Sequence, residues 1–554
     1  MKTQEARTQT MSLDKNLGGE GVTRRGFMGG MGAMMAATAA MAAGVSTAHA
    51  DEAEDAAEAE AKEAADAEAD EAEAAEEAAT EEEAAEESAA EEESATENVP
   101  GSYLNYPTIE STTGWTGTPD DVLALGVSTM PLDDLNQYRE AYIERQTDYT
   151  MEDGTVVPAV FAKVRALIHT YGIGCGNTAN DSSYSRILEV FDEDQAQAFL
   201  EMPMGVEFTA YEFAAKTGRD LEECEEVCEY LASEGFLVAI DVNRGRVFRQ
   251  APYFQGVAEY NTIQIITRGG DVNTDTGVFG YDMMLGTDSD VANTGTPVFY
   301  YVPVDASVTS DGTILPFDDL KEKIKTKNLV AICPCPCRYG ALANTYGYEN
   351  IPSYEDFATG EYEDYFSDLC DQRVETCIMT GDEAAYWIER GMGREITGEQ
   401  AAEYLQRSVD DGFMLETTFG KNTDTICSCH VDSCNILGMW NSIGEAEDIA
   451  ACDAFKQVSH YTLQVDSDLC IACGTCVDRC PLHCITINDD GWAEAGVNCF
   501  RCGQCAYVCP QNARHLVQRD ESELAPLPQG MLDDANVKAA YRFEKGLITF
   551  PEEA

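Results

Sequence analysis

Near its C-terminus the chain contains Cys470-Ile-Ala-Cys473-Gly-Thr-Cys476-Val-Asp-Arg-Cys480-Pro481, and this run recurs as Cys499-Phe-Arg-Cys502-Gly-Gln-Cys505-Ala-Tyr-Val-Cys509-Pro510. Each copy has three cysteines at intervals of three residues and a fourth cysteine followed by proline. This spacing is typical of thiolates that bind [4Fe–4S] clusters, with the fourth cysteine of each run reaching the other cluster. Two zinc knuckles are the alternative, but two complete repeats with both prolines favour iron–sulfur clusters.

Because the fourth cysteine of each run is expected to bind the cluster of the other run, the two runs predict two mixed ligand sets. One cluster is expected to bind Cys470, Cys473, Cys476 and Cys509, and the other Cys499, Cys502, Cys505 and Cys480. Short strands at Cys484–Ile487 and His515–Val517 should complete the two halves. We interpret Cys484 as a small core side chain, because a free cysteine packs like a small hydrophobic residue.

Eight more cysteines lie upstream in three short groups. These are Cys333, Cys335 and Cys337, then Cys370 and Cys377, then Cys427, Cys429 and Cys434. The first group follows a strand-like run, 329–332, and its prolines favour extended chain, in which residues two apart share a side. If 368–377 is helical, its two cysteines, seven residues apart, share one face.

Eight thiolates suffice for two cubane clusters, or for one cluster with spare thiols, whereas one zinc ion would need four. We predict one or two further iron–sulfur clusters here, because a clear iron–sulfur region follows directly; disulfides fit the spacing poorly. The spacing does not reveal which cysteines share a cluster. Arg338 and His430 could tune a cluster through hydrogen bonds, or be an ordinary surface arginine and a packed histidine. Cys452 stands alone, and we interpret it as packing.

Residues 192–253 have the pattern of three helices followed by a hairpin, the order of a winged helix. Its predicted elements are helices at Thr209–Thr217 and from Asp220 to Glu234, and strands at Leu237–Val242 and Val247–Arg249. The helix after Asp220 carries five glutamates and no Lys or Arg, which disfavours contact with DNA phosphates. We therefore expect a structural or docking module, with Cys224 and Cys228 in its core.

The amino-terminal residues look like an export signal. Arg24-Arg25 precede a Gly/Ala/Met-rich run that ends in Ala48-His49-Ala50, which is typical of a cleaved twin-arginine signal. A membrane anchor is the alternative, but the run is only weakly apolar. We expect an exported, periplasmic or extracytoplasmic protein with no transmembrane helix in the mature chain, soluble or held at a membrane by a partner.

The chain is strongly acidic, with 101 Asp and Glu against 35 Lys and Arg, a formal net charge of −66. Residues 51–97 alone hold 23 of these acids and one lysine, and they have no apolar stripe, so we expect a solvated spacer. Such a charge excludes general nucleic-acid binding and favours solubility.

Two resemblances follow from these motifs. Residues Val465–Arg519 resemble the dicluster bacterial ferredoxin domain. Residues Asp192–Arg519 also resemble a group of prokaryotic iron–sulfur proteins with a winged-helix-like segment, a Pro-x3-Gly-x2-Glu stretch (Pro252, Gly256 and Glu259), a Cys-x-Cys-Arg element (Cys335, Cys337 and Arg338), a Glu-Thr-Cys segment (Glu375–Cys377) and a later Cys-x-Cys group. The resemblance implies iron–sulfur electron transfer. The chain departs from the group in its export signal, its acidic spacer and the additional Cys333.

We therefore expect an α+β, multidomain protein. The predicted parts are the signal (1–50), the acidic spacer (51–98), an N-terminal region (99–190), the winged-helix-like module (191–255), a connecting region (256–320), a cysteine-rich α/β domain (321–460), the ferredoxin-type domain (461–520) and a C-terminal tail (521–554). The leading hypothesis is an electron-transfer subunit or partner of an anaerobic respiratory reductase. The alternatives are an oxidoreductase with its own metal centre between Cys333 and Cys434, and a redox-sensing regulator, which the acidic helix and the export signal disfavour.

Overall fold

The computed structural model describes residues 130–242, 245–267, 291, 294–304, 307–308, 319–346, 375–528 and 530–551. The predicted export signal, the acidic spacer and Cys370 lie outside the described residues. Within the described part of the chain, no helix has both the length and the apolar character needed to cross a bilayer.

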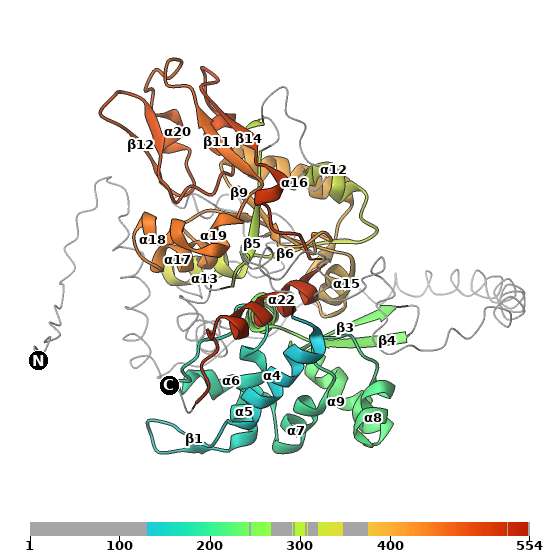
Figure 1. The fold of residues 1–554 in the computed structure, drawn as a ribbon. Coiled ribbons are helices and arrows are strands. Elements are labelled where there is room, and N and C mark those ends of the chain that lie inside the picture. Colours follow the sequence, from blue (N-terminus) through green and yellow to red (C-terminus); the bar gives the residue numbers. More distant parts are fainter. Residues whose placement is uncertain are drawn as a thin grey trace, which may run out of the picture. The chain divides into compact units, whose positions relative to one another are not determined.

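The chain contains both helices and strands throughout its described part (Figure 1), which confirms the expectation of a mixed helix and strand fold. The helices are α4 (Leu132–Glu144), α5 (Ala159–His169), α6 (Ser182–Val190), α7 (Glu193–Glu201), α8 (Ala210–Thr217), α9 (Leu221–Ser233), η2 (Tyr253–Val257), α10 (Ala258–Thr267), α12 (Leu320–Lys325), α13 (Pro336–Tyr346), α15 (Gly381–Glu389), α16 (Gly398–Asp411), α17 (Asn435–Ser442), α18 (Ala446–Ala451), α19 (Asp453–Lys456), α20 (Thr475–Asp478), α21 (Gln504–Tyr507), η5 (Glu521–Glu523) and α22 (Met531–Glu544). The strands are β1 (Tyr149–Thr150), β2 (Val156–Val157), β3 (Leu237–Val242), β4 (Gly245–Gln250), β5 (Phe299–Val302), β6 (Val330–Pro334), β7 (Glu375–Thr380), β8 (Arg394–Glu395), β9 (Met414–Thr418), β10 (Thr425–Cys429), β11 (Tyr461–Val465), β12 (Ile485–Ile487), β13 (Ala493–Ala495) and β14 (Arg514–Gln518).

The segment from α7 to β4 has the predicted order of three helices and a hairpin. Thr209 and Glu212 form a capping box at the start of α8, and the Asp220 side chain accepts hydrogen bonds from the first turn of α9. Strands β3 and β4 pair antiparallel, and Phe208 forms a further bridge to Phe248. Side-chain caps therefore set the helix boundaries here, as the sequence predicts. The assignment of these elements to a winged helix stays a prediction.

The cysteine-rich region is built on a six-stranded sheet in the order β5-β9-β10-β7-β6-β8. Its described strand pairs are all antiparallel. The region therefore mixes helices and strands, as expected of an α/β domain, but its sheet is antiparallel. Residues directly opposite one another in such a sheet point to the same face. One row across five strands therefore consists of Tyr301, Glu416, Cys427, Cys377 and Cys333.

Two local expectations in this region are wrong. Strand β6 ends at Pro334, and Pro336 begins helix α13, so the chain is not extended through Cys337. Proline is tolerated in the first turn of a helix because the amide hydrogen that it lacks has no partner there. Cys377 lies in strand β7 and not in a helix.

The C-terminal segment, expected to be a tail, contains a buried helix. Helix α22, drawn in red in Figure 1, lies beside α4, and Asn536 accepts a hydrogen bond of 2.9 Å from Arg139 of α4. Arg542 near the end of α22 donates to the carbonyl oxygen of His169, at the end of α5, over 2.8 Å. Helix α22 thus joins the last residues of the chain to its first described helices.

A buried ion pair joins the β3–β4 hairpin to the central domain. Arg249 of β4 pairs with Glu383 of α15, and both side chains are almost fully buried. The Glu383 carboxylate also accepts a hydrogen bond of 3.0 Å from the Tyr260 hydroxyl and one of 3.3 Å from the Trp387 indole nitrogen. Since removal of one partner leaves a buried charge unpaired, this contact stabilises the junction.

We expect Glu383→Ala to lower the free energy of unfolding by about 3–5 kcal/mol, because Arg249 would remain buried without its counter-charge. Urea unfolding followed by circular dichroism measures the change. The exposed Glu403 of α16 provides the matched control, since Glu403→Ala removes the same charge from the surface. Equal unfolding midpoints for the two variants would contradict the prediction.

Candidate metal centres

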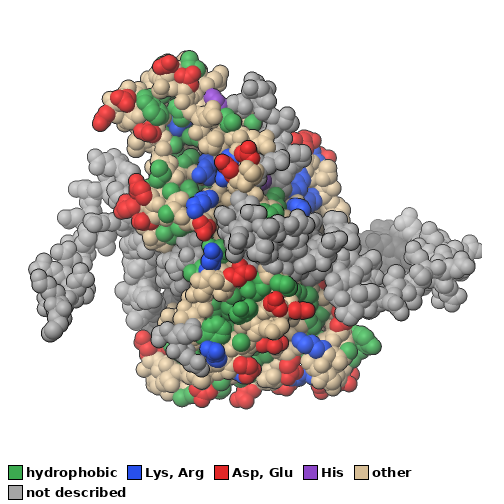
Figure 2. Space-filling view, in the orientation of Figure 1, with side chains coloured by type: hydrophobic (Ala, Val, Ile, Leu, Met, Phe, Trp, Pro, Cys, Tyr) green, Lys and Arg blue, Asp and Glu red, His purple; other side chains and the backbone are tan. Residues whose placement is uncertain are grey.

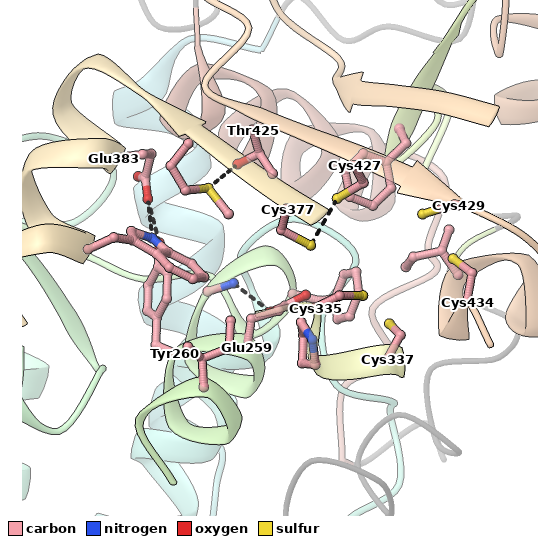
Figure 3. Close-up of a pocket in the computed structure, with 18 of the residues that line it drawn as sticks. Glu259, Tyr260, Cys335, Cys337, Cys377, Glu383, Thr425, Cys427, Cys429 and Cys434 are labelled. Carbon is pink, nitrogen blue, oxygen red and sulfur yellow. Dashed lines mark hydrogen bonds between the residues drawn. The ribbon is translucent and has the colours of Figure 1, made fainter. Parts of the chain in front are cut away.

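One cavity of the central domain is lined by six cysteines, shown in Figure 3. They are Cys335, Cys337, Cys377, Cys427, Cys429 and Cys434. Strand β10 supplies two of them and β7 one, the turn from β6 into α13 supplies two, and the last is the N-cap residue of α17. Six of the eight predicted central ligands are therefore brought together from segments almost a hundred residues apart.

The six thiols form a closed series, which we call the thiol ring. Each interacts with the next in the order Cys335, Cys337, Cys434, Cys429, Cys427, Cys377 and back to Cys335. The Sγ atoms of Cys377 and Cys427 lie 4.0 Å apart. One zinc ion or one [4Fe–4S] cluster needs about four thiolates. The ring has six cysteines, so it can supply the complete ligand set of a metal centre.

The protonation of the ring depends on its own members. Hydrogen bonds from Cys337 and Cys377 hold the pKa of the Cys335 thiol well below its usual range. The hydrogen bond with Cys335, together with burial, raises the pKa of both Cys337 and Cys377. In the absence of metal, the ring is thus expected to retain most of its protons. Metal binding would displace these protons, because the thiolate is the ligand.

Two helix N-termini and an arginine also lie at the ring. Cys335 directly precedes α13, and Cys434 is the N-cap residue of α17, so both thiols lie at the positive end of a helix dipole, which favours thiolates. The buried Arg338 guanidinium lies 4.8 Å from the centre of the Phe413 ring and donates to the Thr376 hydroxyl and the Ser428 carbonyl oxygen. Thr376 precedes Cys377, and Ser428 lies between the two ring cysteines of β10. Arg338 therefore holds together the two strands that carry half of the ring.

Among the described predicted ligands, Cys333 does not line this cavity. The Cys333 thiol donates to the carbonyl oxygen of Cys377 over 3.2 Å. Cys370 lies outside the described residues. Cys452 is partly buried, and its thiol donates to the Asp448 carbonyl oxygen over 3.3 Å.

Two glutamates near the ring were not predicted as site residues. Glu259 lines the cavity and accepts a hydrogen bond of 2.9 Å from the backbone amide of Gly256, and burial raises its pKa to about 8. It follows η2, a π-helical turn of the kind that often marks a functional site. The Pro-x3-Gly-x2-Glu motif was the available signal for Glu259. Nothing in the sequence pointed to Glu416, which belongs to the row across the sheet.

The second predicted ligand set of the C-terminal region also lines one cavity. Cys480, Cys499, Cys502 and Cys505 surround it together with Cys484. The Sγ atoms of Cys484 and Cys480 lie 3.6 Å apart, and the hydrogen bond from Cys484 is the main cause that lowers the pKa of Cys480 to about 6. Cys484 therefore faces the predicted ligands, and it also packs, partly buried, against the small core of this region, as expected. The observed strand β12 begins at Ile485, so Cys484, expected to be its first residue, directly precedes it.

Three members of the first predicted set, Cys470, Cys473 and Cys476, lie on the equivalent loop of the other repeat, and the fourth, Cys509, ends the second run. Backbone amides of Ala493 and Ala513 donate to the sulfurs of Cys470 and Cys509 over 3.4 and 3.3 Å. Cys473 is exposed, and Cys476 is buried. Amide hydrogen bonds to cysteine sulfurs are one of the features that set cluster potentials.

The two repeats share their backbone conformation. Positive φ angles occur at Ala472 and Arg501, and again at His483 and Asn512, which are equivalent positions of the two cysteine runs. The buried Arg514 connects the two runs: it donates to the sulfur of Cys476 in the first run over 3.5 Å and also interacts with Cys505 of the second. The repeated loop geometry supports the expectation that both runs bind the same kind of group.

Comparison with known proteins agrees with this part of the chain. Residues 463–486 match the Fer4 family, described as a 4Fe-4S binding domain. A stretch of 30 residues, 5% of the chain, is 57% identical to a "Probable ferredoxin" of Methanosarcina thermophila. The match covers 52% of that protein, so the chain spans about half the length of this curated relative. No solved structure matches the chain. The protein thus carries a ferredoxin-like, [4Fe–4S]-binding region near its C-terminus; the number of clusters stays a prediction.

We expect Cys377→Ser to lower the iron content by up to about four atoms per chain, because it removes a thiolate from the ring. Cys333→Ser is the matched control, since this neighbour in the same row can still donate its hydrogen bond to the Cys377 carbonyl oxygen. Iron and acid-labile sulfide, determined after anaerobic purification, measure the difference. If the two variants lost iron equally, the distinction between the two cysteines would be wrong.

Proposed function

We propose that this chain is an exported iron–sulfur electron-transfer protein, a subunit or partner of an anaerobic respiratory reductase. In this proposal the thiol ring and the two C-terminal cysteine sets are three sites of one electron path. When bound, the clusters supply one-electron storage. The chain itself provides thiolate ligands, hydrogen bonds to sulfur and an apolar cover that excludes water.

The observation that carries this proposal is a direct contact between the ring and the second set. The Val431 amide donates to the Pro481 carbonyl oxygen over 3.1 Å. Val431 is two residues from Cys429 of the ring, and Pro481 follows Cys480 of the second set. The rings of His430 and His483, on the same two segments, have centroids 5.6 Å apart. One hydrogen bond and a few covalent bonds therefore connect the two sites.

The two C-terminal sets differ in how they are covered. The second set is buried: the Val304 amide donates to the Cys502 carbonyl oxygen over 3.0 Å, and Phe500 packs against Tyr301, Trp440 and Phe455. The first set reaches the surface at Cys473, between side chains that include Ile471, which is 60% exposed. This difference supports an order in which the ring is the inner end of the path and the first set is the outer end.

The surface at the first set suggests the chemistry of its partner. Leu469, Ile471 and Val497 are exposed apolar side chains, and acidic side chains surround them in sequence. Figure 2 shows red acidic and green apolar side chains together on the part that Figure 1 labels α20 and β12. We infer a redox partner protein with a basic rim around an apolar centre, because complementary charge guides a brief encounter.

We also assign the segment from α7 to β4 to the winged-helix class and propose that it is a structural or docking module. Its helix α9 has only acidic charged side chains, including the exposed Glu222, Glu223 and Glu225. The pairs from Glu229 to Arg246 and Arg390 connect it to its own hairpin and to α15. These ion pairs favour a structural role for the segment from α7 to β4, and its acidic helix disfavours contact with DNA phosphates.

The test of the proposed function is the iron and sulfide content of the full chain, purified anaerobically, with the electron paramagnetic resonance spectrum of the reduced protein. We expect about twelve to sixteen irons per chain, for two C-terminal cubanes and one or two more in the centre. Interaction between neighbouring reduced clusters should broaden the spectrum. About eight irons with an occupied C-terminal region would remove the central site from the path.

The outer end of the path can be tested with cytochrome c as a basic acceptor protein. We expect Ile471→Ser to slow the second-order reduction of cytochrome c about tenfold, since loss of this apolar contact costs ~1–2 kcal/mol. The rate should also fall as salt concentration rises. Tyr211→Ser, at a 65% exposed tyrosine of α8, is the control. Equal rates for the two variants, with intact cluster spectra, would place the outer end elsewhere.

A further inference from the structure

Glu416 is a fully buried carboxyl group beside the thiol ring. It lies in β9, directly opposite Tyr301 of β5 on one side and Cys427 of β10 on the other. Neither of its oxygens has a hydrogen-bond partner among the described residues apart from an interaction with the Cys429 thiol. Buried carboxyl groups are normally paired, hydrogen-bonded or bound to metal, so this arrangement needs an explanation.

The atoms around Glu416 have the spacing of a ligand set. A carboxyl oxygen of Glu416 and the sulfurs of Cys429 and Cys434 all lie within 4.8 Å of one another. Metal–sulfur bonds of about 2.3 Å and metal–oxygen bonds of about 2.0–2.2 Å would place one ion among these three atoms. Cys337 is the next thiol in the ring after Cys434 and could provide a fourth ligand.

We propose that Glu416 is a metal ligand, binding one iron or zinc ion together with Cys429 and Cys434. This inference rests on the proposed presence of metal in the thiol ring. The ion could be one iron of a cluster or a single ion, and both cases share the same mixed sulfur and oxygen ligands. A carboxylate is a harder ligand than a thiolate. Among the metal ions of the ring, the ion bound by Glu416 would therefore be the one best suited to bind a further oxygen-donor ligand.

The second buried glutamate of the site provides a matched comparison. Glu259 lines the cavity that the six ring cysteines line, and burial raises the pKa of both Glu259 and Glu416. Glu259, however, already accepts a hydrogen bond from the Gly256 amide, whereas the Glu416 oxygens face thiols. Both glutamates are therefore buried, but of the two only Glu416 has cysteine sulfurs around its carboxyl oxygens.

The experiment compares the full-length wild type with E416Q, E416C and E259Q, each purified anaerobically from ⁵⁷Fe-enriched cells. Metal content and Mössbauer spectra are the readouts. We expect E416Q to lose one metal equivalent per chain, E416C to restore it through a thiolate, and E259Q to match the wild type. Loss of a cluster iron would produce a three-iron cluster signal in the oxidised E416Q protein. Loss of a single ion would remove one zinc or one ferrous component and leave the cluster signals unchanged.

Wild-type metal content and spectra in E416Q would overturn the inference. If E416Q does not fold, the E416C protein still decides, because exchange of an oxygen ligand for sulfur must change the spectrum of one iron or the zinc absorption edge. An unchanged spectrum in E416C would overturn the inference equally. A wild type with metal only at the C-terminal cysteines would instead contradict the proposed central site itself, so the two failures are distinguishable.

Discussion

The register between β10 and its neighbours is the constraint on which the central site depends. It sets Cys427 opposite Glu416 on one side, and its continuation sets Cys427 beside Cys377 on the other, with Cys429 two residues further on the same face. A shift of one residue would turn these side chains to the opposite face of the sheet. The turn from β6 into α13 and the start of α17 then supply the other three thiols. Arg338 holds the strands together through the residues next to the ring cysteines.

This arrangement explains why the ring and the C-terminal region form one unit. Four buried and two half-buried thiols satisfy one another poorly as hydrogen-bond partners, and a metal centre would replace those weak contacts with strong bonds. The strand that ends at Cys429 continues directly to the Val431–Pro481 contact. On the other side, residues 299–304 pair with β9 and also cover the second cysteine set. The same segments thus shape the inner site and shield its neighbour from water.

The sequence predicted what depends on local pattern. The Asp220 cap predicted the start of α9, and the cysteine spacing predicted four of the five cysteines that line the C-terminal cavity. Prediction from the sequence failed for features that depend on the pairing of distant segments. The neighbours of Cys377 and the position of Glu416 follow from strand register, which spacing does not contain. The prolines of 333–337 favour extended chain by local pattern, but Pro336 begins a helix, and the burial of α22 depends on partners almost four hundred residues away.

Metal in the thiol ring, on the same electron path as the C-terminal clusters, can be tested by anomalous X-ray diffraction at the iron and zinc absorption edges, from anaerobically grown crystals of the full chain. We expect iron peaks at both C-terminal cysteine sets and metal within the ring of six cysteines, in contact with Cys429 and Cys434. Peaks at the C-terminal sets alone, with the ring cysteines bound to no metal, would contradict it.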